Sequence, residues 1–300
     1  MSAKELGQIH TVNYRQTTSG LDPAVDFPVD FINVDLPGQL TKQLQTLVRC
    51  GTYHKVVGID MTLDTTGTTG GGQMTGRIRY YAPTRGRCEA FRGAFKAMKS
   101  QMNIQGVNMH TNKLYDFKAP LNDIVHYNGA FPNQATLDGR TPLALYNTQN
   151  AAASIFDVHN STVRPVQGTQ DFFAEGFDTL LASSDEGTET DFVLNDELPY
   201  TGNRDTASTE YEEIPFMLTW TPDSTDFAVN WNWRPDPALF LAVLSGQMSI
   251  VVEELELDGG NTQGLNLNVA VMVSGWKSIM GDPSKKSKRK SSSKKRGSRK

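Results

Sequence analysis

The last seventeen residues carry the densest group of side chains in this chain that could do chemistry. Residues 284–300 hold ten of the 29 lysines and arginines and no carboxylate. The ten are Lys285, Lys286, Lys288, Arg289, Lys290, Lys294, Lys295, Arg296, Arg299 and Lys300. Closely spaced cations bind polyanions, because each neutralised phosphate releases a condensed counterion. We therefore predict that this segment binds nucleic acid; the alternatives are a nuclear-import signal alone or a solubilising tail.

The rest of the chain has the opposite charge. Residues 1–283 keep 19 basic against 33 acidic residues, a formal charge of −14 against +10 for the tail, so the net value of −4 describes neither part. A run of like charges with Ser and Gly and no apolar residue cannot bury enough surface to offset the entropy lost on ordering. We expect a folded body, 1–283, and a separate disordered basic arm, 284–300.

A second group of cations lies inside the acidic body. Segment 77–99 carries seven basic residues and one acid, Glu89. Apolar residues at intervals of three and four predict a helix over 86–103 with one buried stripe: Cys88, Phe91, Phe95, Met98 and Met102. Beside that stripe, within about 60° of one another, lie Arg85, Arg92, Lys96 and Lys99. These four residues are predicted to form an inner wall that faces nucleic acid, or else a solvated helix face.

Signatures of catalysis are absent from the sequence. The glycine-rich run at 67–72 lacks the Lys-Ser/Thr of a phosphate-binding loop and joins two predicted strands, which indicates a hairpin loop. Among the five histidines, only His54 lies near a cysteine, Cys50, and such a pair is a weak metal signal. No nucleophile elbow of the form Gly-x-Ser-x-Gly is present. We predict that the chain is not an enzyme and needs no cofactor.

Acidic residues gather in 171–213, which holds thirteen of them and one base, Arg204. The favoured interpretation is a solvated acidic surface. A paired-carboxylate site and Ca²⁺ bound between subunits are the alternatives, since carboxylate oxygens suit that ion. Two cysteines, Cys50 and Cys88, do not make a disulfide framework and are expected to be buried thiols. No stretch reaches the roughly 18–20 apolar residues of a membrane span, so none is predicted.

Most of the body alternates apolar and polar residues, which is typical of half-buried strands. The predicted strands are 8–15, 25–34, 56–63, 74–81, 214–221, 227–233, 248–257 and 265–276, with shorter pieces at 113–118, 124–128 and 154–159. Further helices are predicted at 40–48 and 235–244. Trp231 and Trp233 point to one face of their strand, and a core position is favoured over a subunit interface for them.

The order of these elements resembles the jelly-roll coat proteins of small circular single-stranded DNA viruses. The likeness covers most of the chain. It rests on the helix at 40–48 followed by Tyr53-His54-Lys55-Val56, on the run Gly-Arg-Ile-Arg-Tyr-Tyr-Ala-Pro-Thr at 76–84, and on the closing strand before the basic arm. Many such coats carry the arm at the N-terminus, whereas here it is C-terminal.

That resemblance implies an all-β jelly-roll subunit with elaborated loops and two or three short helices. A single barrel is preferred, and a double jelly roll is the alternative. The subunit would assemble with copies of itself into an icosahedral shell around viral single-stranded DNA or another nucleic acid. Its expected location is the virion, with the host nucleus and nuclear-import factors as a further place and partner during infection.

Two other classes of function remain as alternatives. A β-barrel histone or nucleic-acid chaperone of the nucleoplasmin type also joins acidic tracts to a basic import signal. An enzyme ranks third, because jelly rolls host sugar and metal chemistry but no site in this sequence supports it.

Overall fold

The computed structural model describes most of the predicted body. The described residues are 8–17, 27–66, 71–106, 115–119, 121, 134–136, 142–144, 154–163, 207–221, 226–236, 239–257 and 265–281. The basic arm and most of the acidic segment lie outside these ranges, as does the predicted strand at 124–128, so the predictions made for them remain predictions.

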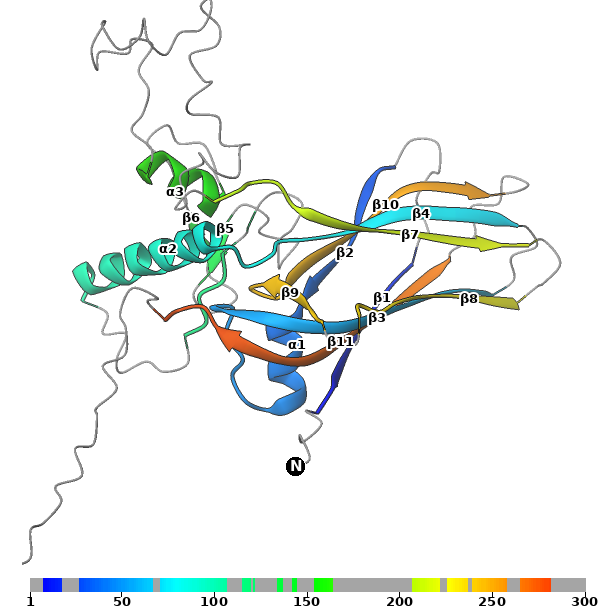
Figure 1. Ribbon diagram of the computed structural model, residues 1–300, viewed down its shortest axis with the longest axis horizontal. Helices are drawn as coiled ribbons and strands as arrows, with labels where there is room; N and C mark the ends of the chain where they lie inside the picture. Colours follow the sequence, from blue (N-terminus) through cyan, green and yellow to red (C-terminus); the bar gives the residue numbers. More distant parts are fainter. Residues whose placement is uncertain are drawn as a thin grey trace, which may run out of the picture.

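Two antiparallel sheets dominate the described part of the chain, which is mostly β as predicted (Figure 1). The first sheet has the order β1 (His10–Thr17), β11 (Asn266–Ser278), β3 (Thr52–Thr66) and β8 (Asp226–Trp233), and the short β9 (Leu241–Leu244) also pairs with β3. The second has the order β2 (Val29–Asp35), β10 (Gln247–Leu257), β4 (Gly72–Tyr80) and β7 (Glu212–Trp220). A small separate pair joins β5 (Gln134–Thr136) and β6 (Pro142–Ala144).

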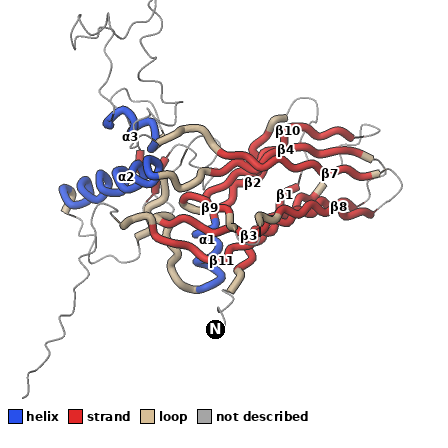
Figure 2. The backbone as a smooth tube through the Cα atoms, viewed as in Figure 1, coloured by secondary structure: helices blue, strands red, loops and turns tan. Residues whose placement is uncertain are grey.

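Three helices accompany the sheets in the described residues: α1 (Leu36–Leu44), α2 (Arg85–Ile104) and α3 (Ile155–Val163). Figure 2 shows α2 and α3 together at one end of the two sheets, while the strands extend away to the other end. None of the described helices is long and apolar enough to cross a membrane.

The main core lies between the two sheets. The inward residues of β3, Ile59, Met61 and Leu63, are fully buried, and they face Ile78 and Ile250 of the second sheet. Along β7 and most of β11, every second residue is buried on this inner face, as the period of two in the sequence predicts, whereas β10 is buried on both faces from Gln247 to Val252. A second buried cluster joins α2 and α3 to residues 115–121 at the helical end.

Strands from the two ends of the chain interleave. β11 lies between β1 and β3, and β10 lies between β2 and β4. An early and a late strand therefore form the centre of each of the two main sheets, so strands from both ends of the chain share each sheet.

The helix predicted at 40–48 is displaced toward the N-terminus. α1 begins at Leu36, where Asp35 Oδ1 accepts a hydrogen bond from Gly38 N at 3.1 Å, and it ends at Gln45 in the left-handed conformation. Val48 lies beyond the helix but is buried in the main core, and its backbone N–H donates to Thr41 Oγ1 at 2.9 Å. The helical spacing in the sequence therefore arose from two parts, the helix α1 and the loop after it, which both bury apolar side chains in the same core.

The helix predicted at 235–244 is wrong in its last part, which is strand β9. Pairing with β3 sets this outcome, since Leu244 lies opposite Tyr53 in the sheet. The turn after β9 uses Ser245 and Gly246, both with positive φ. A Cβ on Gly246 would lie 2.6 Å from Pro37 Cδ, so the position requires glycine for space as well as for conformation.

The strand predicted at 154–159 is also wrong, because these residues begin α3. Ser154 Oγ accepts a hydrogen bond from Asp157 N at 3.2 Å, which caps the helix start. Ile155 and Phe156 are buried, and the ring of Phe156 meets Tyr81 edge to face with centroids 5.0 Å apart. Packing in the helical cluster overrides the β preference of this short apolar run.

Both tryptophans of β8 belong to the core, as favoured from the sequence. Trp231 and Trp233 are half-buried and pack against the main cluster, and the Trp231 ring lies 6.1 Å from that of Phe216 on the second sheet.

Candidate nucleic-acid interface

α2 carries the predicted basic stripe, and the predicted helix is confirmed. Thr84 Oγ1 accepts a hydrogen bond from Arg87 N and caps the helix. Cys88, Phe91 and Met98 are buried in the helical cluster, with Phe95 and Met102 partly buried beside them. The apolar stripe therefore fixes which side of the helix the neighbouring cations occupy.

The four predicted cations of α2 have different surroundings. Arg85 is exposed and forms an ion pair with Glu89 at 3.1 Å, one turn along the helix. Arg92 is half-buried, and its Nε donates to the backbone oxygen of Ile279 at 2.5 Å. Lys96 is exposed and Lys99 half-buried, and neither forms an ion pair with a described residue. Arg92, Lys96 and Lys99 thus keep charges that no described carboxylate neutralises.

The other cations of segment 77–99 are neutralised. On the outer face of the second sheet, Arg79 Nε lies 2.9 Å from Glu213 Oε1, and Arg77 Nε lies 3.1 Å from Glu253 Oε2. Slight burial would raise the pKa of Glu213, but hydrogen bonds from both arginines outweigh it and lower that pKa. The basic patch of the sequence is therefore reduced to the stripe on α2.

Arg87 has a structural role that its place in the basic segment does not reveal. Its guanidinium is 2% exposed and donates to Glu212 Oε1 at 2.7 Å, to the Ala82 carbonyl and to the Ser208 carbonyl, each at 3.0 Å. It also lies 4.8 Å from the centre of the Tyr81 ring. These contacts fix the start of α2 against the segment that enters β7.

A pocket of about 700 Å³ opens at the helical end of the molecule. Its aromatic walls are Phe91 and Phe95 of α2, Tyr115, Phe117, and Trp276 of β11. Arg49, Thr52, Asp116 and Ser278 add polar groups, and the other described lining residues are Leu47, Gly51 and Met280. The Phe95 and Tyr115 rings are stacked with centroids 5.8 Å apart, whereas Phe91 meets Phe117 edge to face at 5.6 Å.

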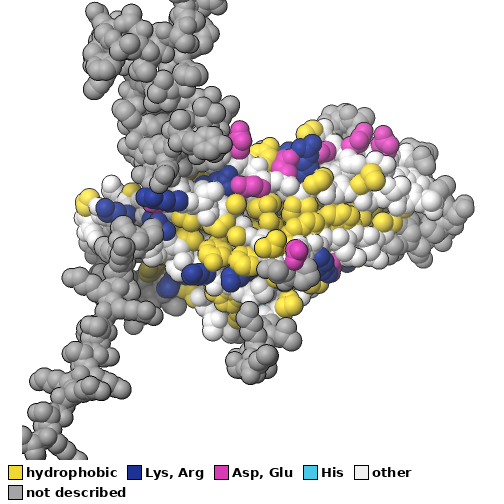
Figure 3. Space-filling model, in the orientation of Figure 1, with side chains coloured by type: hydrophobic (Ala, Val, Ile, Leu, Met, Phe, Trp, Pro, Cys, Tyr) yellow, Lys and Arg dark blue, Asp and Glu magenta, His cyan; other side chains and the backbone are white. Residues whose placement is uncertain are grey.

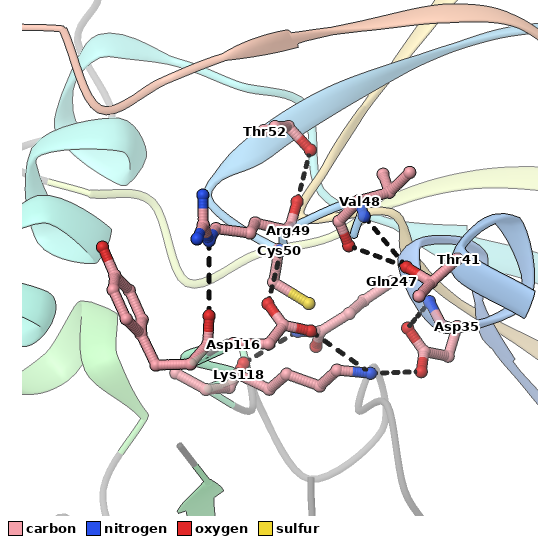
Figure 4. A network of polar contacts seen from close by, with 12 residues as sticks. Asp35, Thr41, Val48, Arg49, Cys50, Thr52, Asp116, Lys118 and Gln247 are labelled. Carbon is pink, nitrogen blue, oxygen red and sulfur yellow. Dashed lines mark hydrogen bonds and ion pairs between the residues drawn. The ribbon is translucent and has the colours of Figure 1, made fainter. Parts of the chain in front are cut away.

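Polar contacts hold residues 115–119, one wall of the pocket, against the loop between α1 and β3 (Figure 4). The Cys50 backbone N–H donates to Asp116 Oδ1 at 3.1 Å, and Arg49 Nε donates to the Tyr115 carbonyl at 3.3 Å. Lys118 Nζ lies 2.6 Å from Asp35 Oδ2 and 3.9 Å from Asp116 Oδ2. This wall is therefore tied to the capped start of α1.

Burial controls the titration of this network. Desolvation raises the pKa of the Cys50 thiol well above its usual value, so the group is a neutral buried thiol rather than a reactive thiolate. It also raises the pKa of Asp116, against the opposing charge of Lys118. For Lys118, burial acts to lower the pKa, but the negative charge of its neighbours outweighs burial and raises it. Both cysteines are free and buried, as predicted.

Within the described ranges, no group of three or more His, Cys, Asp and Glu side chains could hold a metal ion. His54, the histidine considered with Cys50, is fully buried, and desolvation lowers its pKa to about 3. Ca²⁺ between subunits was predicted to involve acids of 171–213, of which only Glu210, Glu212 and Glu213 lie within the described residues.

Reasoning from the sequence missed most of the pocket. Arg49, Tyr115 and Trp276 come from three distant segments that no single pattern connects. The one available signal was that basic and aromatic residues are neighbours within 49–55 and within 113–118. No protein-family model matches this chain, and no curated protein or solved structure matches it either.

Proposed function

We propose that this chain is a jelly-roll coat protein that assembles into a shell and packages nucleic acid. The observation that carries the proposal is the pairing of the main strands. β1 pairs with β11, β2 with β10, β3 with β8, and β4 with β7. The first strand thus pairs with the last and the second with the last but one, as in a long hairpin rolled into two sheets, the arrangement of a jelly roll.

The distribution of charge supports a role in packaging. The arm carries +10 and the body −14, so the body alone would repel a polyanion. Figure 3 shows Lys and Arg side chains over the end that carries α2. Residue 281, the last described before the arm, lies next to Met280, which lines the pocket at this end. Arm and stripe would therefore offer their charge to nucleic acid from one end of the subunit.

Assembly of the purified chain tests the proposal. Full-length protein is mixed with single-stranded DNA and examined by electron microscopy and light scattering. We expect closed shells of megadalton mass that protect the DNA from nuclease. A small ring that binds histones would favour the nucleoplasmin-like chaperone, and a protein that stays monomeric with and without DNA would contradict the proposal.

A further inference from the structure

We propose that the pocket at the helical end takes one nucleobase of a single-stranded nucleic acid, while the cations beside it bind the adjoining phosphates. The inference rests on the proposed function, which brings nucleic acid to this end of the subunit. It goes further in naming a site on the folded body that contacts bases, in addition to the arm.

The walls of the pocket are suited to the flat face of a base. Phe95, Tyr115 and Trp276 are half-buried, so each keeps part of its ring accessible within the pocket. Stacking on aromatic side chains tolerates any sequence, because every base has a π face. Phe91 and Phe117 are nearly fully buried, and Phe117 packs edge to face against Phe95 with ring centroids 5.8 Å apart.

Arg49 adds a cation at the same wall. Its guanidinium carbon lies 4.9 Å from the centre of the Tyr115 ring, and the residue is exposed. A guanidinium held over a ring can stack on a base or donate to a phosphate. The carboxylate of the pocket, Asp116, already accepts the Cys50 N–H and lies near Lys118, so its negative charge is partly offset.

Two α2 cations that no described carboxylate neutralises, Arg92 and Lys99, are neighbours of residues that line the pocket. Lys99 follows Phe95 by four residues, so the two side chains neighbour each other on the helix surface. Arg92 donates to the carbonyl of Ile279, the residue before Met280 of the pocket rim. Aromatic and cationic side chains thus lie side by side, the arrangement with which proteins bind single strands.

Along the chain, the arm begins four residues after Met280, which lines the pocket. Lys285 follows Met280 by five residues, and five residues of extended chain span at most about 18 Å. The first cations of the arm are therefore tethered within reach of phosphates on either side of a base in the pocket. Charge complementarity at this end favours a nucleic-acid strand over an apolar peptide as the occupant.

Two oligonucleotides of equal length and charge separate base binding from charge binding. One is oligo-dT, and the other carries abasic sites in place of most bases. With full-length protein in about 0.15 M salt, fluorescence anisotropy should show that oligo-dT binds roughly tenfold more tightly or better, the effect expected for one stacked base. Tyr115→Ala and Phe95→Ala should remove most of that ratio while the dependence of affinity on salt stays the same.

Matched variants and cross-linking complete the test. Tyr115→Phe keeps the ring and should keep the ratio, and Phe240→Ala removes an exposed ring outside the pocket lining and should also keep it. If the alanine variants unfold by circular dichroism, oligo-dT with 5-iodo-deoxyuridine is cross-linked to the unchanged protein instead. Adducts on peptides that contain Phe95, Tyr115 or Trp276 are expected.

Equal, salt-dependent affinity for the two oligonucleotides, or adducts confined to 285–300, would overturn the base pocket and leave the proposed function intact. Failure of the unchanged protein to bind either oligonucleotide would count against the proposed function as well. Preference for oligo-dT that persists in both alanine variants would place base binding elsewhere on the protein.

Discussion

Arg87 and Glu212 are separated by 125 residues in the chain, yet their side chains meet at 2.7 Å. Arg87 is almost fully buried, whereas the Glu212 side chain is 36% exposed, so solvent screens only one partner of the ion pair. Glu212 also accepts the Ala82 backbone N–H at 2.8 Å. The pair therefore joins the start of α2 to the start of β7 and fixes how the helical end meets the second sheet.

Replacing Arg87 with Met should destabilise the body by about 2–3 kcal/mol, because it leaves the carbonyls of Ala82 and Ser208 without their donor. Urea unfolding followed by circular dichroism measures the loss. Arg85→Ala is the matched control on the same helix, and its exposed pair should cost no more than about 0.5 kcal/mol. Equal costs for the two variants would show that the buried arginine does not join α2 to the sheet.

His54 should make stability depend on pH. Its pKa is lowered to about 3 in the folded state by burial, against 6.5 for the unperturbed group, so the unfolded chain binds this proton more readily. The contribution of neutral His54 to the free energy of unfolding is therefore fully present above about pH 6.5. It is lost as the pH falls toward 3, at up to about 1.4 kcal/mol per pH unit.

Unfolding free energies measured between pH 7 and pH 4 check this behaviour. His54→Leu should lose the His54 part of the slope, while His10→Gln, on strand β1, should retain it. Slopes that are the same in the unchanged protein and in His54→Leu would contradict the prediction.

Deleting residues 284–300 should leave folding intact and abolish most of the binding of nucleic acid, since the segment has no apolar residue to add to a core. With up to ten neutralised phosphates, the slope of log affinity against log salt could approach about −7 on single strands, at roughly −0.7 per contact. Affinity measured from 50 to 300 mM salt gives the slope. Binding by the full chain that ignores salt would argue against the arm as the main electrostatic contact.

The double variant Lys96→Gln, Lys99→Gln should still form shells but should package less nucleic acid, because it removes two cations that no described carboxylate neutralises. The ratio of absorbance at 260 and 280 nm in purified particles measures the content. Arg85→Gln is the control, since Glu89 already neutralises that residue. Unchanged content in the double variant would mean that this face of α2 is merely solvated.

Trp231→Ala should destabilise the subunit by about 3 kcal/mol, because the half-buried ring packs between the two sheets against Phe216. Circular dichroism and size-exclusion chromatography follow the variant, and Trp231→Phe should recover much of the loss. A fully stable Trp231→Ala subunit that no longer assembles would instead assign this ring to a contact between subunits.

The sequence alone was sufficient to assign a helix or a strand wherever a long segment repeats its apolar residues with one regular period. β3, β10 and β11 alternate over many residues, and α2 repeats its apolar residues at intervals of three and four, so period alone assigned them. Short apolar runs were ambiguous. Ile155 and Phe156 were predicted as strand but entered a helix, and Val243 and Leu244 were predicted as helix but entered a strand, since each took the form its packing partners required.

The number and position of charged residues could likewise be read from the sequence, but the tertiary structure decides which of them are neutralised, buried or exposed. The sequence showed seven cations in 77–99, but only the structure shows that partners from β7 and β10 neutralise Arg77 and Arg79 and that the fold buries Arg87. The pocket has the same origin: Arg49 and Trp276 line one pocket because β3 pairs with β11 across more than two hundred residues. The local pattern of residues determines whether a segment tends to form a helix or a strand. Contacts between distant segments depend on which strands pair, and this is decided only in the tertiary structure.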